Sequence, residues 1–174
     1  MTLPWAHAVW QQYGAAIDTL ADVITRCPDH LWTYAVWEDS DDARYGQFWF
    51  VAYHTLSWLD LFLTGSPDRF VLPPPFIRGQ LPDQPYTKDQ ILTYLGACRQ
   101  RCKATLLAMT EEQAQRRCVF DWMEPSYGEL QLYGMRHTQE HAAHLSLVLG
   151  HQQVPGLDWI AQARDDNAGM PHEI

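Results

Sequence analysis

Apolar side chains recur at spacings of three and four residues in four long segments of this chain, and this spacing predicts four helices. The first covers residues 5–26, with Pro4 at its start and Pro28 just beyond its end. The second covers residues 45–64 and stops at the Gly65-Ser-Pro67 sequence, a combination typical of a helix terminus. Because the second segment is apolar nearly all round, we expect it to be deeply buried.

The third predicted helix has a clear start in the sequence. Thr87 and Gln90 have the spacing of a capping box, in which each side chain bonds the backbone of the other residue, and a helix over residues 87–109 should follow. Thr110 and Gln113 have the same spacing. This second pair predicts a short extra helical turn.

The fourth predicted helix covers residues 127–149. The tail after it, residues 151–174, should contain at most a short helix around residues 158–163. We find no internal repeat and no pattern of alternation typical of β-strands. A chain of 174 residues is long enough for one hydrophobic core. We therefore predict a single all-α domain over residues 1–174, with its bundle over about residues 5–150.

Residues 65–86 contain six prolines, which makes this connection unusually long for a compact domain. An extended proline-rich segment advances about 3.1 Å per residue and can pass the roughly 30 Å length of a helix of twenty residues. The second and third helices would then run parallel, unlike neighbours joined by a short turn. The predicted fold is a four-helix bundle with this long crossover between its second and third helices.

Composition narrows the classes of function. A hydrophobic content of 47% with eight tryptophans indicates a packed globular protein. The net charge of −9 argues against nucleic-acid binding, which needs a basic surface, so small-molecule ligands or protein partners are expected. The sequence offers neither a signal peptide nor 18 uninterrupted apolar residues, so we expect a cytoplasmic protein that does not enter the membrane.

The four cysteines do not have the spacing of a disulfide framework. Cys98 and Cys102 could face one metal ion, but both fall on the apolar stripe of the third predicted helix. We interpret them as small buried side chains.

Three histidines carry the strongest chemical signal. His137 and His141 are four residues apart in the fourth predicted helix, which puts both imidazoles on one face. His54 lies in the buried second helix. Burying several imidazoles requires partners, and a shared divalent cation would supply one, so we predict an open three-histidine metal site. Imidazole suits zinc, nickel, iron or copper better than calcium or magnesium.

Two residues close to His137 and His141, Glu140 and His144, each have two possible roles. Glu140 either faces solvent or contacts metal-bound water, where it would accept a proton. His144 is either an orienting group or an alternative ligand. Both are candidate catalytic residues. Aromatic side chains of the second helix and of the loop near Trp122 could line an apolar pocket beside the metal.

Two other metal motifs match poorly. The His137–His141 segment fits the H-x-x-E-H pattern of inverzincin proteases, but little sequence remains after it for a further ligand. A ferritin-like di-iron site would need paired Glu-x-x-His motifs, and the chain offers one half of such a pair.

The segment Tyr53-His54-Thr-Leu-Ser-Trp-Leu-Asp60, together with His137-x-x-x-His141 and the Leu-Ser-Leu-Val-Leu-Gly run after it, resembles the DinB/YfiT-like metalloenzymes. The resemblance covers about residues 5–150. It implies an up-down-down-up four-helix bundle in which His54, His137 and His141 hold one divalent ion, nickel or zinc first and iron or manganese next. It also implies chemistry that depends on low-molecular-weight thiols, and a homodimer. The Ala142-Ala-His144 sequence departs from the small-residue-and-glutamine run common in the family.

The sequence therefore predicts a metal-dependent enzyme, either a thiol-dependent transferase or a hydrolase, acting on a small-molecule substrate. Two alternatives remain at this stage. One is a non-catalytic metal-binding or stress-response bundle, in which the ion only ties two helices together. The other is a metal-free helical ligand binder.

Overall fold

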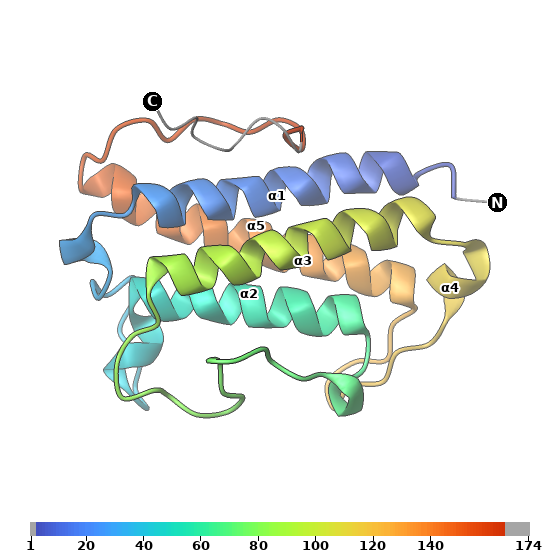
Figure 1. Ribbon diagram of the computed structural model, residues 1–174, viewed down its shortest axis with the longest axis horizontal. Helices are drawn as coiled ribbons and strands as arrows, with labels where there is room; N and C mark the ends of the chain where they lie inside the picture. Colours follow the sequence, from blue (N-terminus) through green and yellow to red (C-terminus); the bar gives the residue numbers. More distant parts are fainter. Residues whose placement is uncertain (1–2, 166–174) are drawn as a thin grey trace.

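The computed structural model describes residues 3–165, so residues 1–2 and 166–174 of the predicted domain lie outside the described part. Its long helices lie side by side along one axis (Figure 1). They are α1 (Ala6–Arg26), α2 (Phe48–Thr64), α3 (Lys88–Ala108) and α5 (Tyr127–His151), and a short α4 (Glu111–Gln115) precedes α5. No strand occurs between residues 3 and 165, which confirms the all-α prediction.

The proline-rich connection returns the chain along the bundle. In Figure 1, α2 and α3 both run from left to right, whereas α1 and α5 run the opposite way. The connection between α2 and α3 passes along the length of α2. α1 packs against α3 and α5, and α2 packs against the same two helices.

Side-chain caps set the starts of several helices. Both predicted capping boxes are present: Thr87 accepts a hydrogen bond from the Gln90 backbone N–H at 3.2 Å, and Thr110 does the same for Gln113 at 3.3 Å. α2 begins at Phe48, three residues later than predicted, because the residues before it form the 3-10 turn η2 (Ala43–Gly46).

The core lies between the four long helices. Its largest fully buried side chains include Trp49, Tyr13, Phe48 and Phe62. All four cysteines are free and buried, which confirms the interpretation of Cys98 and Cys102 as small buried side chains. Asp60 of α2 is also buried, where it accepts a hydrogen bond from the Tyr94 hydroxyl of α3 and pairs with Arg101. These polar contacts fix α2 against α3.

The tail after α5 has no helix in its described part, residues 152–165. The sequence allowed at most a short helix around residues 158–163, and this segment lies along α1 without helical structure. The backbone N–H of Ala163 donates to the Gln11 carbonyl at 2.9 Å. A bond to another element therefore replaces a bond that a helix would have made within the tail.

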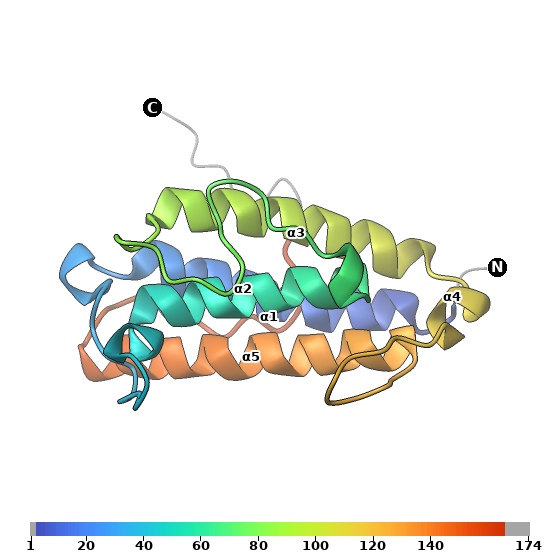
Figure 2. The ribbon, with the colours of Figure 1, turned by 90° about the horizontal axis from the view of Figure 1, so that it is seen from below.

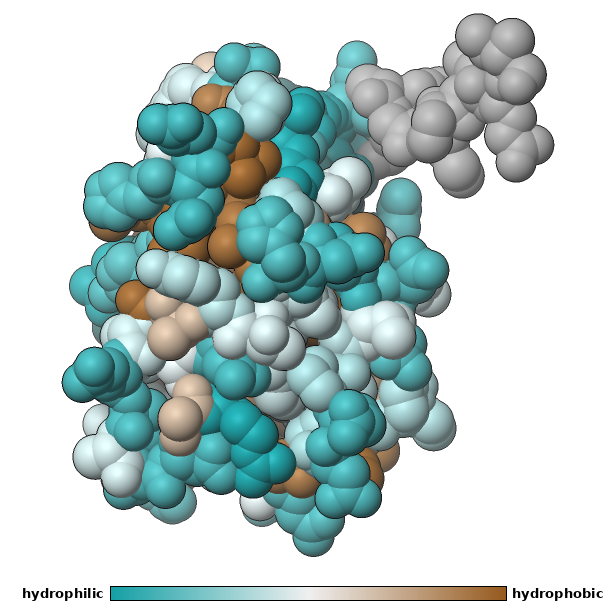
Figure 3. Space-filling view, turned by 90° about the vertical axis from the view of Figure 1, so that its left-hand side faces the viewer, coloured by the Kyte–Doolittle hydropathy of each residue, from teal (hydrophilic) through white to brown (hydrophobic). Residues whose placement is uncertain are grey.

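One end of the bundle is mostly polar (Figure 3). Figure 3 shows one end of the bundle, where hydrophilic residues predominate and hydrophobic surface is confined to small areas. Within residues 3–165, no helix combines the length and the apolar character that crossing a membrane requires.

Candidate metal centre

The fold brings His54, His137 and His141 together between two neighbouring helices. His54 lies in the middle of α2, and the other two lie one turn apart on α5, which runs beside α2 (Figure 2). One ligand atom from each imidazole lies within 4.8 Å of the other two. The ring centroids are 4.5, 5.1 and 5.3 Å apart. Three imidazoles around a tetrahedral ion at about 2.1 Å have centroids roughly 5 Å apart, so the arrangement fits one ion.

The polar atoms of the site also fit a cation. The Nδ1 atoms of His137 and His141 are buried and have no hydrogen-bond partner within residues 3–165. Burying imidazoles without partners costs free energy. An ion shared by the three rings would offset this cost, and three nitrogen donors match the preference of zinc or nickel.

Burial keeps these imidazoles neutral. It lowers the pKa of His54 to about 4, with a smaller contribution from His141. The pKa of His137 falls to about 3, again mainly through burial and then through the two neighbouring histidines. Burial and His144 lower the pKa of His141, while Glu140 opposes the shift. A histidine coordinates a metal ion through a deprotonated ring nitrogen, so the neutral form that burial favours is the form that coordination at neutral pH requires.

Aromatic rings enclose the cluster. Phe50 and Trp58, each four residues from His54 on α2, have ring centroids 6.2 and 5.9 Å from its imidazole. Phe62 meets His137 edge to face at 5.9 Å. The low polarity of these walls explains why the histidines are held in the neutral form.

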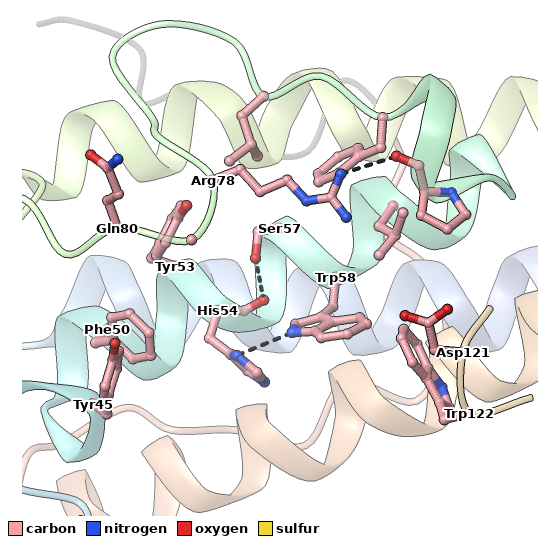
Figure 4. A pocket seen from close by; sticks show the side chains of 15 residues that line it. Tyr45, Phe50, Tyr53, His54, Ser57, Trp58, Arg78, Gln80, Asp121 and Trp122 are labelled. Atoms are coloured by element: carbon pink, nitrogen blue, oxygen red, sulfur yellow. Dashed lines mark hydrogen bonds between the residues drawn. The ribbon is translucent and has the colours of Figure 1, made fainter. Parts of the chain in front are cut away.

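Trp58 also bonds directly to a candidate ligand. Its indole N–H donates to His54 Nδ1 at 3.2 Å, and the other ring nitrogen of His54 points toward α5 (Figure 4). A neutral imidazole that accepts at Nδ1 carries its hydrogen on Nε2. Sequence reasoning missed this bond, although the spacing of four residues between His54 and Trp58 is a signal that could have found it.

Trp37 was also missed as a site residue. It lies in the acidic loop before α2, with its ring centroid 6.1 Å from His141 and 5.8 Å from His144. The backbone N–H of Val36 donates to the Gly46 carbonyl at 2.7 Å and holds this loop. A Cβ atom on Gly46 would lie 2.0 Å from the Trp37 carbonyl oxygen, so only glycine fits there. Trp37 is 36% exposed and closes one side of the site.

The two candidate catalytic residues lie outside the group of three ligands. His144 is exposed, with its ring centroid 5.8 Å from that of His141. Glu140 is also exposed, and it lies close enough to affect the pKa of His141. Their proposed catalytic roles stay predictions.

A pocket of about 350 Å³ lies beside the cluster on the α2 side. Its walls include His54, aromatic side chains of α2 and Trp122, and the proline-rich connection forms its opposite wall (Figure 4). These are the aromatic side chains for which the sequence left open a role as a pocket lining beside the metal. A molecule bound there would contact one of the three candidate ligands.

Comparisons with known proteins place the chain in a family. No curated protein and no solved structure gave a significant match. The family model described as the DinB superfamily matches residues 7–145, a range that includes the three clustered histidines and nearly all of the bundle. The chain therefore belongs to the DinB superfamily.

Proposed function

We propose that this protein is a metal-dependent enzyme whose single divalent cation is held by His54, His137 and His141. The observation that carries the proposal is the convergence of three neutral imidazoles from two helices within 4.8 Å. Family membership and the helix directions in Figure 1 also support the up-down-down-up bundle as its scaffold. Nickel or zinc is the proposed ion, with iron or manganese as alternatives.

The number of protein ligands favours catalysis over a purely structural role. Within residues 3–165, the group of side chains able to hold the ion consists of the three histidines. No carboxylate or thiol in this part of the chain joins them as a fourth ligand. Structural zinc sites usually have four protein ligands, whereas catalytic sites keep one position for water or substrate. When bound, the cation would supply Lewis acidity that lowers the pKa of a coordinated water or thiol.

The side chains around the cluster have separate proposed roles. The rings of Trp37 and Phe50 limit the access of water to the histidines. Glu140 is proposed to accept a proton, and His144 to orient His141 or a bound molecule. The proposed reaction is a thiol-dependent transfer or a hydrolysis of a small-molecule substrate.

Metal content tests the ligand set. After incubation with nickel or zinc and removal of free ions, elemental analysis should find about one ion per chain in the wild-type protein. His54→Ala should lose most of this metal, because two remaining ligands bind much more weakly than three. His151→Ala is the matched control, since His151 lies at the end of α5 outside the cluster. Equal metal content in the two variants would contradict the proposal.

A cobalt-substituted protein tests whether a coordination position is open. Adding a low-molecular-weight thiol should produce a thiolate-to-cobalt charge-transfer band, because the thiol can take the position that protein ligands leave. If neither thiols nor small anions change the cobalt spectrum, the site is closed and its role is structural.

A further inference from the structure

The pocket beside His54 has a composition that specifies the kind of molecule it can hold. Its volume of about 350 Å³ lies in the range of small-molecule sites. Phe50, Tyr53 and Trp58 of α2 form one wall, and Trp122 closes one end. Trp58 and Trp122 meet edge to face, with their centroids 5.2 Å apart. Such walls favour a flat, apolar molecular body.

One cation, Arg78, projects into this aromatic pocket from the proline-rich connection (Figure 4). The backbone beside it is fixed on both sides: the Ile77 carbonyl accepts a hydrogen bond from the Tyr53 hydroxyl at 3.1 Å, and the Ile77 N–H donates to the Tyr86 hydroxyl at 3.2 Å. Because Tyr53 and Tyr86 are themselves buried, the backbone next to Arg78 is anchored to the core, while the Arg78 side chain is exposed.

The guanidinium of Arg78 keeps donors available for a ligand. One of its N–H groups donates to the Pro67 carbonyl at 3.0 Å, and the group lies 5.5 Å from the centre of the Phe70 ring. No carboxylate within residues 3–165 pairs with it. An arginine offers five N–H donors in a planar fork that matches a carboxylate, so most of these donors face no protein acceptor.

The other charged side chain of the pocket, Asp121, makes the two ends of the pocket electrostatically different. Asp121 lies beside Trp122, away from Arg78 in Figure 4. Its carboxylate would repel an anion at that end, while Arg78 would attract one. A ligand with one negative charge is therefore expected to bind in a single orientation.

We propose that this pocket binds a small aromatic carboxylate, with the carboxylate on Arg78 and the ring against Tyr53 and Trp58. The inference deepens the proposed function and rests on it in one respect, because the bound molecule would be the substrate that reaches the ion at His54. Binding itself requires only the pocket and Arg78.

Calorimetric titration with naphthoate and with its neutral isostere naphthamide tests the charge selectivity at neutral pH. The wild-type protein should bind naphthoate more tightly. Arg78→Gln should weaken naphthoate binding roughly tenfold or more, because it removes a charge-assisted hydrogen bond, and should leave naphthamide binding nearly unchanged. Arg69→Gln is the matched control, since it removes one positive charge from the same connection outside the pocket walls.

Leu72→Trp, which adds bulk inside the pocket, tests the location of the probe. It should abolish the binding of both compounds. Equal affinity of the wild-type protein for the two probes, an equal loss in Arg69→Gln, or full binding in Leu72→Trp would overturn the inference. Measuring the metal content separates a failure of this inference from a failure of the proposed function. If the chain binds naphthoate selectively but takes up no ion, the enzyme proposal is contradicted and the pocket assignment is supported.

Discussion

At the scale of single residues, the bond from Trp58 to His54 should affect how easily the proposed site takes an ion. The indole N–H occupies the lone pair of Nδ1, and this leaves the imidazole hydrogen on the nitrogen that points toward α5. Coordination through that nitrogen requires the hydrogen to move to Nδ1, where the indole N–H opposes it. Coordination through Nδ1 would instead compete with the indole directly.

Trp58→Phe should therefore raise metal affinity. Removing one hydrogen bond of about 1 kcal/mol corresponds to a gain of roughly fivefold, which competition against a chelator of known affinity can measure. Trp122→Phe is the control, since Trp122 packs on Trp58 without bonding a histidine. A weaker metal affinity in Trp58→Phe than in the control would mean that the indole orients His54 for binding.

The lowered histidine pKa values predict how the metal-free protein responds to acid. Burial reduces the pKa from 6.5 to about 4 for His54 and to about 3 for His137. Between pH 6.5 and these values the unfolded chain binds protons that the folded chain does not, so the free energy of unfolding decreases as the pH falls. Their contribution to stability is complete above pH 6.5 and is lost as the pH falls through about 4 for His54 and about 3 for His137.

Thermal melts of the chelator-treated protein across this range check the prediction. The wild-type Tm should fall as the pH is lowered. The double variant His54→Gln/His137→Gln should show a clearly smaller fall, and His7→Gln controls for removing a histidine elsewhere. A double variant with the full wild-type dependence on pH would assign the effect to other groups.

At the scale of elements, Gly134 sets how closely α5 approaches α1 and α2. A Cβ atom there would lie 2.6 Å from the Tyr13 hydroxyl and 3.0 Å from the Phe62 ring, and both side chains are fully buried. Gly134→Ala should destabilise the protein by about 1–3 kcal/mol, because the packed core must shift. The fall in Tm should be about 2–4 °C per kcal/mol for a chain of this size.

Gly150→Ala is the control for this substitution. Gly150 also lies in α5, but an added Cβ meets no atom within 4 Å. The change should raise stability by up to about 1 kcal/mol, because alanine has the higher helix propensity. If both variants melted at the same temperature, close packing at Gly134 would not explain its presence.

Elements whose ends depend on local bonds could be predicted from the sequence. The capping boxes at Thr87 and Thr110 join residues three apart, so their spacing was sufficient. The exact start of α2 and the course of the segment around residues 158–163 could not be predicted from the sequence. The start of α2 depends on the 3-10 turn η2 before it, and the course of residues 158–163 depends on a backbone hydrogen bond to α1.

The same distinction holds for the candidate site. The pair His137 and His141 follows from the period of one helix, and the structure places His54 beside it. Trp37 could not be predicted, because its contact with His141 depends on how a loop folds over another helix. Arg78 could not be predicted either, since the two tyrosines that fix its position come from α2 and from the end of the crossover.

At the scale of the whole molecule, Asp18 of α1 joins three parts of the fold. It is 5% exposed and pairs with Arg99 of α3 at 2.6 Å. It also accepts the backbone N–H of Arg164 at 2.7 Å, and the Arg164 guanidinium makes two hydrogen bonds of 2.6 Å with Asp22. The tail is therefore held to the bundle by charged groups of α1.

Asp18→Asn should loosen this attachment without changing the size of the side chain. The loss of a charged acceptor should reduce stability by about 1–3 kcal/mol. It should also increase tryptic cleavage after Arg164 roughly tenfold, since proteolysis in the native state follows local opening of the cleaved segment. Mass spectrometry of the product ending at Arg164 measures this rate. Asp158→Asn is the control, because Asp158 is exposed on the same tail. A lower Tm with unchanged cleavage would show that Asp18 stabilises α1 against α3 while other contacts hold the tail.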